Sequence, residues 1–277
     1  MARNTEQYKK MLFIGSGNIA SAVACGLVSS KTVPAEFITV YNRNSNKFAK
    51  FQKLGINTTL DIKTALDGVS YIFIAVKPNV VGEVIELLSK EDPNLKEKVI
   101  VSLAASVPCS YIESKAGMPL KIIRTMPSTP ITIGEGVLAV SSYGEVSSKE
   151  LQFFCRMMSS IAYVTVIDES LMNPIISVQG SSPAYVYLFI KAMLDASEKQ
   201  GIDRNVALPL ILKTIKGAVS MVEKCDLPIE TLISNVASPN GTTLKALNSF
   251  EKDDFCGAVE RAMTACTERA NEISEEL

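Results

Sequence analysis

A glycine-rich turn near the start of the chain has the residue types of a dinucleotide site. Gly15-Ser16-Gly17-Asn18-Ile19-Ala20 follows a short apolar run, Met11–Ile14, and opens a segment with few polar residues. Gly15 permits a tight turn, Gly17 lets the backbone approach a pyrophosphate, and Ala20 lets a helix lie close to a strand. The start of that helix offers free N–H groups to the phosphate charge. The pattern predicts a pyridine-nucleotide site, with a purely structural turn as the alternative.

The end of the next apolar run, Phe37–Tyr41, indicates which nucleotide is preferred. An NAD site usually has Asp or Glu there, which binds the ribose hydroxyls. No acidic residue occurs from Phe37 to Asn46, and Arg43 offers a cation for a 2′-phosphate. We therefore predict a preference for NADPH and leave the use of NADH open. The alternative is that Arg43 is an ordinary exposed arginine.

Composition excludes several other kinds of chemistry. The 277 residues contain no histidine, so a histidine base, a catalytic triad and a histidine-ligated metal are excluded. No metal is expected. Lys+Arg total 28 against 29 Asp+Glu, which gives no basic field for nucleic acid. The six cysteines have no C-x-x-C spacing, as is typical of reduced thiols in a cytoplasmic protein.

Neither secretion nor membrane insertion is expected. The first ten residues, MARNTEQYKK, lack the apolar run of a signal peptide. The longest charge-free stretch, Ser170–Ile190, contains Asn173, Pro174 and Pro183, which makes it a poor membrane span.

Up to residue 168 the pattern predicts an α/β Rossmann-type NAD(P)-binding domain. Near-continuous apolar strands that alternate with helices indicate a parallel sheet covered on both faces. Strands are expected at 11–14, 37–41, 71–76, 98–103, 120–124, 136–142 and 162–167. Helices are expected at 18–29, 45–54, 61–67, 79–90 and 147–158.

After Asp168 no strand is expected, and the apolar spacing becomes helical. Helices are expected at 185–199, at 205–224, at 228–236, from 242 and from 254. We therefore divide the chain into 1–168, the nucleotide domain, and 169–277, an all-α dimerisation domain. Helices with this much apolar surface often bury it against a second copy, so a homodimer is expected; a self-contained bundle is the alternative.

Ligands of open α/β sheets bind beyond the carboxyl ends of the strands. In Ala75-Val76-Lys77-Pro78, the proline stiffens the chain after Lys77. In Ser102-Leu103-Ala104-Ala105, small residues would let a nicotinamide lie close to the backbone. In Arg124–Pro130, two prolines predict a rigid loop. The alternative for each segment is an ordinary loop. The alternative for Lys77 is an exposed lysine without a catalytic role.

One segment of the helical part is unusual. In Asn235–Leu244, Pro239 and Gly241 stop one helix, and Thr242 and Thr243 open the next. Free N–H groups and hydroxyls at a helix start form a carboxylate site. Thr242 as a simple N-cap is the alternative. The turn Gln179–Tyr185 either faces the cofactor or forms a joint between helices.

The chain resembles the pyrroline-5-carboxylate reductases over nearly its whole length. The most specific match is Ser238–Thr243, because the family pattern is Ser-Pro-Gly-Gly-Thr/Ala-Thr. The resemblance is carried by Gly15–Ala20, Ala75–Pro78, Ser102–Ala105, Arg124–Pro130, Gly180–Tyr185 and Ser238–Thr243, with Asp226-Leu227-Pro228 upstream.

The resemblance implies an NADP-binding fold followed by an intertwined helical dimerisation domain, with dimers often assembled into decamers. It also implies a cytoplasmic enzyme that reduces L-1-pyrroline-5-carboxylate to L-proline by hydride transfer from NADPH, the last step of proline biosynthesis.

The family's functional residues carry over to positions in this sequence. The catalytic residue would be Thr243, which donates a hydrogen bond to the imine. The substrate would be bound by Glu169, Asp226, Asn235, Thr242 and Thr243. NADPH would be bound by Ile14, Gly15, Ser16, Gly17, Asn18, Ile19, Asn42, Arg43, Ala75, Val76, Lys77, Pro78, Leu103, Ala104 and Ala105.

Four positions depart from the family. Asn240 and Ser182 replace glycines, and Ser128 and Ile62 replace asparagines. Two other functions stay open. A hydroxyacid dehydrogenase of similar architecture would need a lysine in the helical part, for which Lys191, Lys213 and Lys216 are candidates by type. The departures also suit a non-catalytic regulatory relative that binds NADPH.

Overall fold

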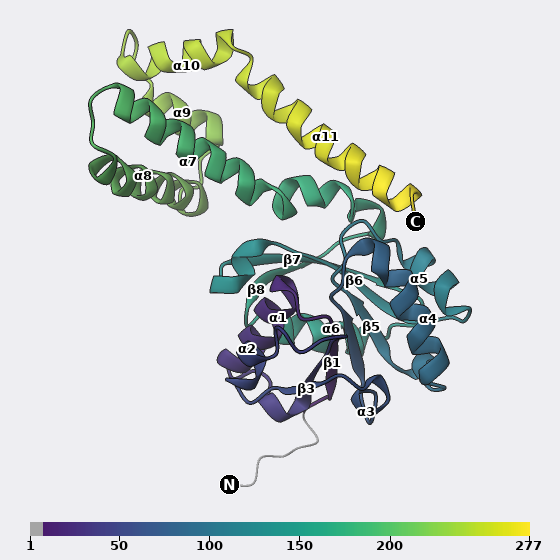
Figure 1. Cartoon of the computed structure of the whole chain (residues 1–277). Helices are drawn as coiled ribbons and strands as arrows, with labels where there is room; N and C mark the ends of the chain where they lie inside the picture. Colours follow the sequence, from purple (N-terminus) through teal and green to yellow (C-terminus); the bar gives the residue numbers. More distant parts are fainter. Residues whose placement is uncertain (1–7) are drawn as a thin grey trace. The chain divides into compact units, whose positions relative to one another are not determined.

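The computed structural model describes residues 8–277, which form two compact units (Figure 1). The first unit contains the residues up to Ser181 together with Cys266–Leu277, and the second contains Ser182–Ala265. The polypeptide therefore passes between the units twice, and its last residues belong to the first unit.

An eight-stranded sheet forms the centre of the first unit. The strand order is β3-β2-β1-β4-β5-β6-β7-β8, and every pair is parallel except β6 with β7. The order reverses between β1 and β4, which is where such sheets bind ligands. The strands are β1 (Met11–Ile14), β2 (Ile38–Tyr41), β3 (Asn57–Thr59), β4 (Tyr71–Ile74), β5 (Val99–Ser102), β6 (Lys121–Pro127), β7 (Gly136–Tyr143) and β8 (Ala162–Val166).

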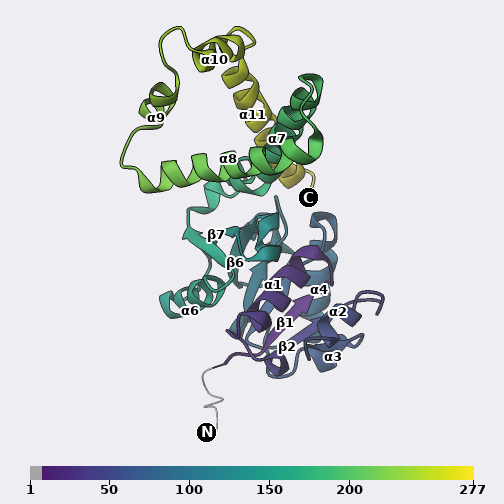
Figure 2. The same ribbon diagram turned by 90° about the vertical axis from the view of Figure 1, so that its left-hand side faces the viewer.

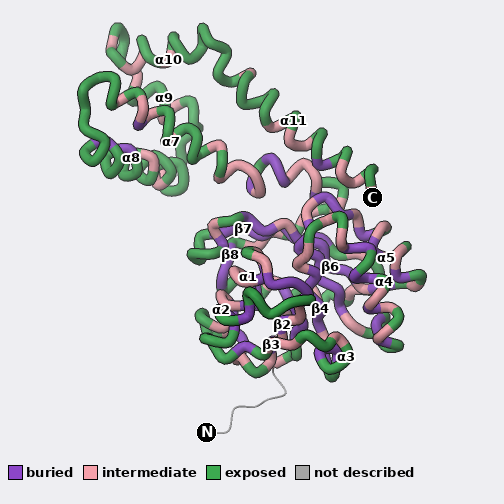
Figure 3. Tube along the Cα trace, in the orientation of Figure 1, coloured by how far each residue is buried: buried purple, intermediate pink, exposed green. Residues whose placement is uncertain are grey.

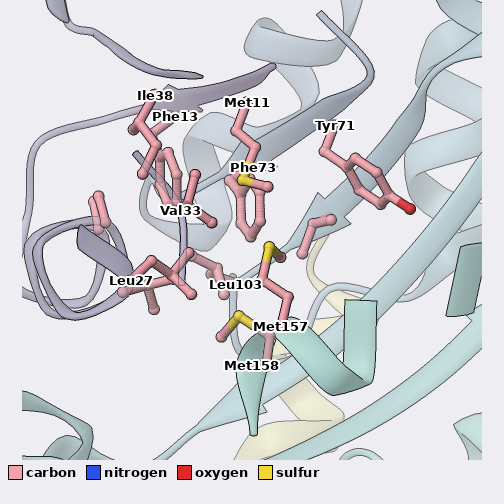
Figure 4. Packing of buried hydrophobic residues seen from close by; sticks show 14 of the residues in the cluster. Met11, Phe13, Leu27, Val33, Ile38, Tyr71, Phe73, Leu103, Met157 and Met158 are labelled. Carbon is pink, nitrogen blue, oxygen red and sulfur yellow. The ribbon is translucent and has the colours of Figure 1, made fainter. Parts of the chain in front are cut away.

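Successive side chains of each strand point to opposite faces, so the sheet has a core on each side. On one face, Phe13 and Phe73 stack with ring centroids 4.2 Å apart, and Met157 and Met158 belong to the same cluster (Figure 4). That face is covered by α1 (Asn18–Ser29), α2 (Ala49–Gln52) and α6 (Ser148–Met158).

The opposite face is covered by α3 (Ile62–Ala65), α4 (Val81–Glu91) and α5 (Cys109–Ala116). The neighbouring residues of the same strands, such as Leu12 and Ile72, pack there and are fully buried. Burial on both faces explains the continuous apolar strands, and it confirms the predicted Rossmann-type domain.

Several elements differ from the expectations. β3 and α5 were not expected, because Asn57–Thr59 is polar and α5 has a weak apolar stripe. The helix expected at 45–54 is reduced to α2, since the polar residues before it form an exposed turn. β6 extends to Pro127, so Arg124 lies inside the strand, whereas it was expected to end the strand 120–124 and begin the loop Arg124–Pro130.

The second unit is helical, with α7 (Ser182–Lys199), α8 (Arg204–Lys224), α9 (Ile229–Val236), α10 (Thr242–Lys252) and the first half of α11 (Phe255–Glu275). α7 packs on α8 (Figure 2) around a small cluster of Leu194, Ala207 and Ile211. Most residues of the second unit are exposed (Figure 3). Large apolar side chains are among the exposed ones, including Tyr187, Leu188, Leu210, Val219 and Ile233. An exposed apolar surface of this extent indicates an interaction surface.

α8 is the longest apolar helix of the second unit. Within residues 8–277 it is the one helix whose length and composition would allow it to cross a bilayer, with a mean hydropathy of 1.3. A single helix of this kind is weak evidence, because packed helices of non-membrane proteins also meet the criterion.

Candidate functional site

A cavity of about 620 Å³ opens in the first unit at the switch point of the sheet. Its walls are the segments that follow β1, β2 and β4, at the carboxyl edge where α/β sheets bind ligands. α4 completes it. The lining residues are Ile14, Gly15, Ser16, Gly17, Tyr41, Asn42, Arg43, Asn44, Asn46, Lys47, Ala75, Val76, Lys77, Val80, Glu83, Val84 and Leu87.

Gly15 forms the tight turn after β1. Its N–H donates to the Tyr41 carbonyl at 2.9 Å, and its φ is +108°. A Cβ at this position would lie 2.5 Å from the carbonyl oxygen of Ala75. The turn therefore requires glycine for reasons within the protein itself.

Gly17 is different, because nothing in the protein requires it to be glycine. It is the N-cap of α1, with an ordinary φ of −69°, and a Cβ there would meet no atom within 4 Å. Gly17 has no side chain that could accept a hydrogen bond from the first turn of α1, so the first amides of α1 stay available at the cavity wall. This open helix start fits the pyrophosphate of a dinucleotide.

The turn after β2 supplies the polar end of the cavity. Asn42 Nδ2 donates to the Asn44 carbonyl at 2.9 Å, which fixes the start of the turn. Arg43 is largely exposed, and its Nη1 lies 3.6 Å from Oε1 of Glu83 on α4. Lys47 and Lys77 also line the cavity. Three cations at one cavity suit a ligand with several phosphates.

Sequence analysis missed Lys47 and Glu83, together with the α4 wall. The signal was present in the spacing Val80, Glu83, Val84 and Leu87, which is one face of a helix. Only knowledge of which face of α4 borders the cavity would have selected Glu83, and Lys47 lies in the turn after β2, where no such spacing exists.

Six of the residues assigned to NADPH by resemblance do not border this cavity. Leu103 N–H donates to the Ile74 carbonyl at 3.0 Å, so the chain after β5 continues beside β4 at the same sheet edge. Contact of these six residues with a cofactor stays a prediction. The six are Asn18, Ile19, Pro78, Leu103, Ala104 and Ala105.

A buried polar cluster lies at Arg124 of β6, which is only 4% exposed. Its Nη1 donates to Glu169 Oε1 at 3.3 Å, and its Nη2 donates to Asn173 Oδ1 at 2.7 Å. The same Glu169 oxygen accepts the Cys109 N–H at 2.8 Å, at the first residue of α5. Burial lowers the pKa of Arg124, and the Glu169 carboxylate opposes that shift. Glu169, a predicted substrate residue, is thus already engaged within the first unit.

The cluster continues to the end of the chain. Asn173 Nδ2 donates to Asn271 Oδ1 and to Ser274 Oγ, each at 3.0 Å. Ser274 Oγ also donates to the Ser106 carbonyl at 2.7 Å. These bonds hold the last turns of α11 on the nucleotide-binding unit.

The other predicted substrate residues lie in the second unit. Thr242 and Thr243 are the first two residues of α10, whose N-cap is Gly241. Asn235 and Asp226 are exposed, as is Thr242, whereas Thr243 is half-buried. Because Gly241 provides no side-chain cap, the first amides of α10 are available to an anion.

Two departures from the family have local explanations. Asn240 has φ +58°, a left-handed conformation that asparagine adopts more readily than other non-glycine residues. The Ser128 hydroxyl accepts the Val137 N–H at 2.8 Å and is buried, so it stabilises the pairing of β6 with β7. Within residues 8–277, no group of three or more His, Cys, Asp or Glu side chains is placed to hold a metal.

The fold and the cavity define a class, the dinucleotide-binding proteins with a Rossmann-type domain. Residues 10–106 match the family model described as NADP oxidoreductase coenzyme F420-dependent. Residues 169–273 match the model described as pyrroline-5-carboxylate reductase dimerisation.

Known proteins similar to the chain identify the family. The chain is 34% identical over 269 residues to pyrroline-5-carboxylate reductase of Escherichia coli K12, covering 96% of this chain and 99% of that protein. The chain is 32% identical to pyrroline-5-carboxylate reductase of Pseudomonas aeruginosa, and the match covers 97% of this chain and 98% of that protein. The crystal structure of Plasmodium falciparum pyrroline carboxylate reductase with NADP bound superposes with a TM-score of 0.88 at 30% identity, over 97% and 99% of the two chains. This chain belongs to the pyrroline-5-carboxylate reductase family, as the resemblance implied.

Proposed function

We propose that this chain reduces L-1-pyrroline-5-carboxylate to L-proline, with NADPH as the hydride donor. The observation that carries the proposal is the open start of α1 at Gly17, which borders a cavity lined by Arg43, Lys47 and Lys77. Family membership supplies the reaction. The hydroxyacid dehydrogenase alternative is not favoured, since the curated relatives are pyrroline-5-carboxylate reductases.

NADPH, when bound, supplies the hydride. The amides at the start of α1 would hold its pyrophosphate, and Arg43 would hold its 2′-phosphate. The predicted residues Asn42, Ala75, Val76 and Lys77 line the same cavity. The remaining six assigned residues would extend the binding site along the sheet edge.

The substrate residues would act by orientation. Asn235, Thr242 and the first amides of α10 would bind the substrate carboxylate, and the Thr243 hydroxyl would donate to the imine nitrogen. Glu169 and Asp226 would line the substrate site. An imine that enters already protonated would instead donate its N–H to the Thr243 oxygen, and the reaction then needs no strong acid. This explains how a chain without histidine performs it.

The helical part, 169–277, would form a homodimer with a second copy, while 1–168 would bind the nucleotide. The exposed apolar side chains of α7 and α8 support this assembly. We further propose a decamer of five dimers and a cytoplasmic location, without a membrane or nucleic-acid partner.

Replacing Arg43 with alanine is expected to raise the Kd for NADPH about tenfold, because a charge-assisted bond to the 2′-phosphate is lost. The Kd for NADH should change little, since NADH has a hydroxyl at that position. Equilibrium titration of both nucleotides tests this. An equal change for both would mean that Arg43 does not contact the 2′-phosphate.

Replacing Thr243 with alanine is expected to lower kcat/KM for pyrroline-5-carboxylate about tenfold, through loss of one hydrogen bond to the reacting imine. Thr243→Ser should restore most of the activity, because serine keeps the hydroxyl. Steady-state kinetics of both variants provide the measurement. Wild-type kinetics in Thr243→Ala would remove its catalytic role.

The activity is tested by following NADPH absorbance with pyrroline-5-carboxylate, then with NADH in place of NADPH. A parallel assay offers NADP⁺ with a 3-hydroxy acid. We expect oxidation of NADPH that depends on the imine, and no reaction with the hydroxy acid. Nucleotide binding without turnover on any cyclic imine would instead support the regulatory alternative.

A further inference from the structure

The Glu83 carboxylate lies beside Arg43, the residue proposed to bind the 2′-phosphate of NADPH. Glu83 lies in the first turn of α4 and lines the same cavity as Arg43, with its Oε1 3.6 Å from Arg43 Nη1. The side chains of Arg43 and Glu83 are 71% and 70% exposed. Ion pairs between exposed side chains contribute little to folding, so this pair can open at small cost when a ligand binds.

We propose that Glu83 competes with the 2′-phosphate of NADPH for Arg43, and thereby limits the preference of this chain for NADPH over NADH. The inference rests on the proposed function, because it concerns the selectivity of that site. A 2′-phosphate carries close to two negative charges at neutral pH. To bind Arg43 it must displace the Glu83 carboxylate or tolerate it as a neighbour, and either reduces the affinity.

NADH meets the same two residues without this conflict. Its ribose hydroxyl carries no charge, so the pair of Arg43 with Glu83 can stay closed. The carboxylate can also accept a hydrogen bond from the hydroxyl, as the acid after the second strand does in NAD sites. In this chain β2 ends without an acid, and α4 supplies one from the other wall of the cavity.

The charge balance around the cavity makes Glu83 the residue to test. Among the lining residues of the described part of the chain, Arg43, Lys47 and Lys77 are cations, and Glu83 is the one carboxylate. Its neutralisation therefore changes the local charge next to Arg43 without altering any other group. Because both side chains are solvated, the expected gain in NADPH affinity is about 3- to 10-fold.

Glu86 provides a matched control on the same helix. It lies three residues after Glu83, its side chain is 58% exposed, and its Oε1 is 3.4 Å from Lys115 Nζ. It is absent from the cavity lining. Glu86→Gln therefore makes the same change of charge, in the same helix, away from the cavity.

The experiment measures Kd for the full-length wild type, Glu83→Gln and Glu86→Gln. The ligands are NADPH, NADH, adenosine 2′,5′-bisphosphate and AMP, of which the last two isolate the effect of the 2′-phosphate. Glu83→Gln should tighten NADPH and the bisphosphate about 3- to 10-fold and leave NADH and AMP unchanged or weaker. Glu86→Gln should shift none of the four by more than about twofold. The gain should shrink at high salt, because screening weakens exposed charge interactions.

Three results would overturn the inference: unchanged NADPH affinity in Glu83→Gln, an equal gain for NADPH and NADH, or the same gain in Glu86→Gln. A wild type that binds neither NADPH nor NADH would instead contradict the proposed function. A wild type that binds NADPH, with no effect of Glu83→Gln, would contradict the inference alone.

Discussion

A Gly17→Ala protein is expected to fold like the wild type and to bind NADPH about 100-fold more weakly. A Cβ at Gly17 would meet no protein atom within 4 Å, and φ is −69°, so the protein itself accommodates alanine. Alanine is a poorer N-cap than glycine, which should cost at most about 1 kcal/mol of unfolding free energy. The added methyl group would occupy the space where the start of α1 receives a pyrophosphate, so charged hydrogen bonds to the amides are lost.

Gly15→Ala serves as the comparison, because here the conflict lies within the protein. Its Cβ would lie 2.5 Å from the Ala75 carbonyl oxygen, at a φ of +108°. We expect this variant to lose stability as well as binding. Thermal unfolding and NADPH titration of both variants separate the two effects. Normal NADPH affinity in Gly17→Ala would place the pyrophosphate elsewhere.

An Arg124→Met protein is expected to lose about 3 kcal/mol of unfolding free energy. The substitution leaves the Glu169 carboxylate without its cation and the Asn173 oxygen without its donor. The value is at the lower end for a broken buried pair, since the Glu169 side chain is still 28% exposed. The loss should also loosen the last turns of α11, which reach this cluster through Asn173.

The measurement for Arg124 is denaturant unfolding, with hydrogen exchange at 266–277 as a local readout. Arg156→Met, at an exposed arginine of α6, is the control and should change the unfolding free energy by less than about 0.5 kcal/mol. Adding Glu169→Gln to Arg124→Met should recover part of the loss, because the unpaired charge is removed. Equal stability of Arg124→Met and Arg156→Met would show that the cluster does not stabilise the fold.

The fold was predictable where apolar pattern and local chemistry agree. Strands such as Tyr71–Ile74 are buried on both faces, and this produces a continuous apolar run that sequence analysis recognises. β3 was missed because a polar edge strand of Asn57–Thr59 carries no such run. The antiparallel pairing of β6 with β7 is likewise not encoded in either strand's own pattern.

The candidate site was predictable where the backbone itself forms it. Gly15 and Gly17 were identified because their role depends on local conformation and space, which glycine spacing reveals. Glu83 was missed because its role depends on which face of α4 borders the cavity, and Lys47 because its role depends on how the turn after β2 folds. Arg124 was expected to end a strand and begin a loop, because Pro127 and Pro130 indicated a rigid loop from Arg124 to Pro130. In the structure that charge is buried and paired with Glu169 from 45 positions later in the chain.

Transfer of the hydride from NADPH to the imine can be followed directly with an isotope label. NADPH carrying deuterium at both C4 positions of the nicotinamide is incubated with pyrroline-5-carboxylate and the full-length protein, and the product is analysed by mass spectrometry. We expect L-proline with one deuterium at C5, formed by the wild type and strongly reduced in Gly17→Ala. Proline without deuterium, or no proline from a wild type that binds NADPH, would contradict the proposed function.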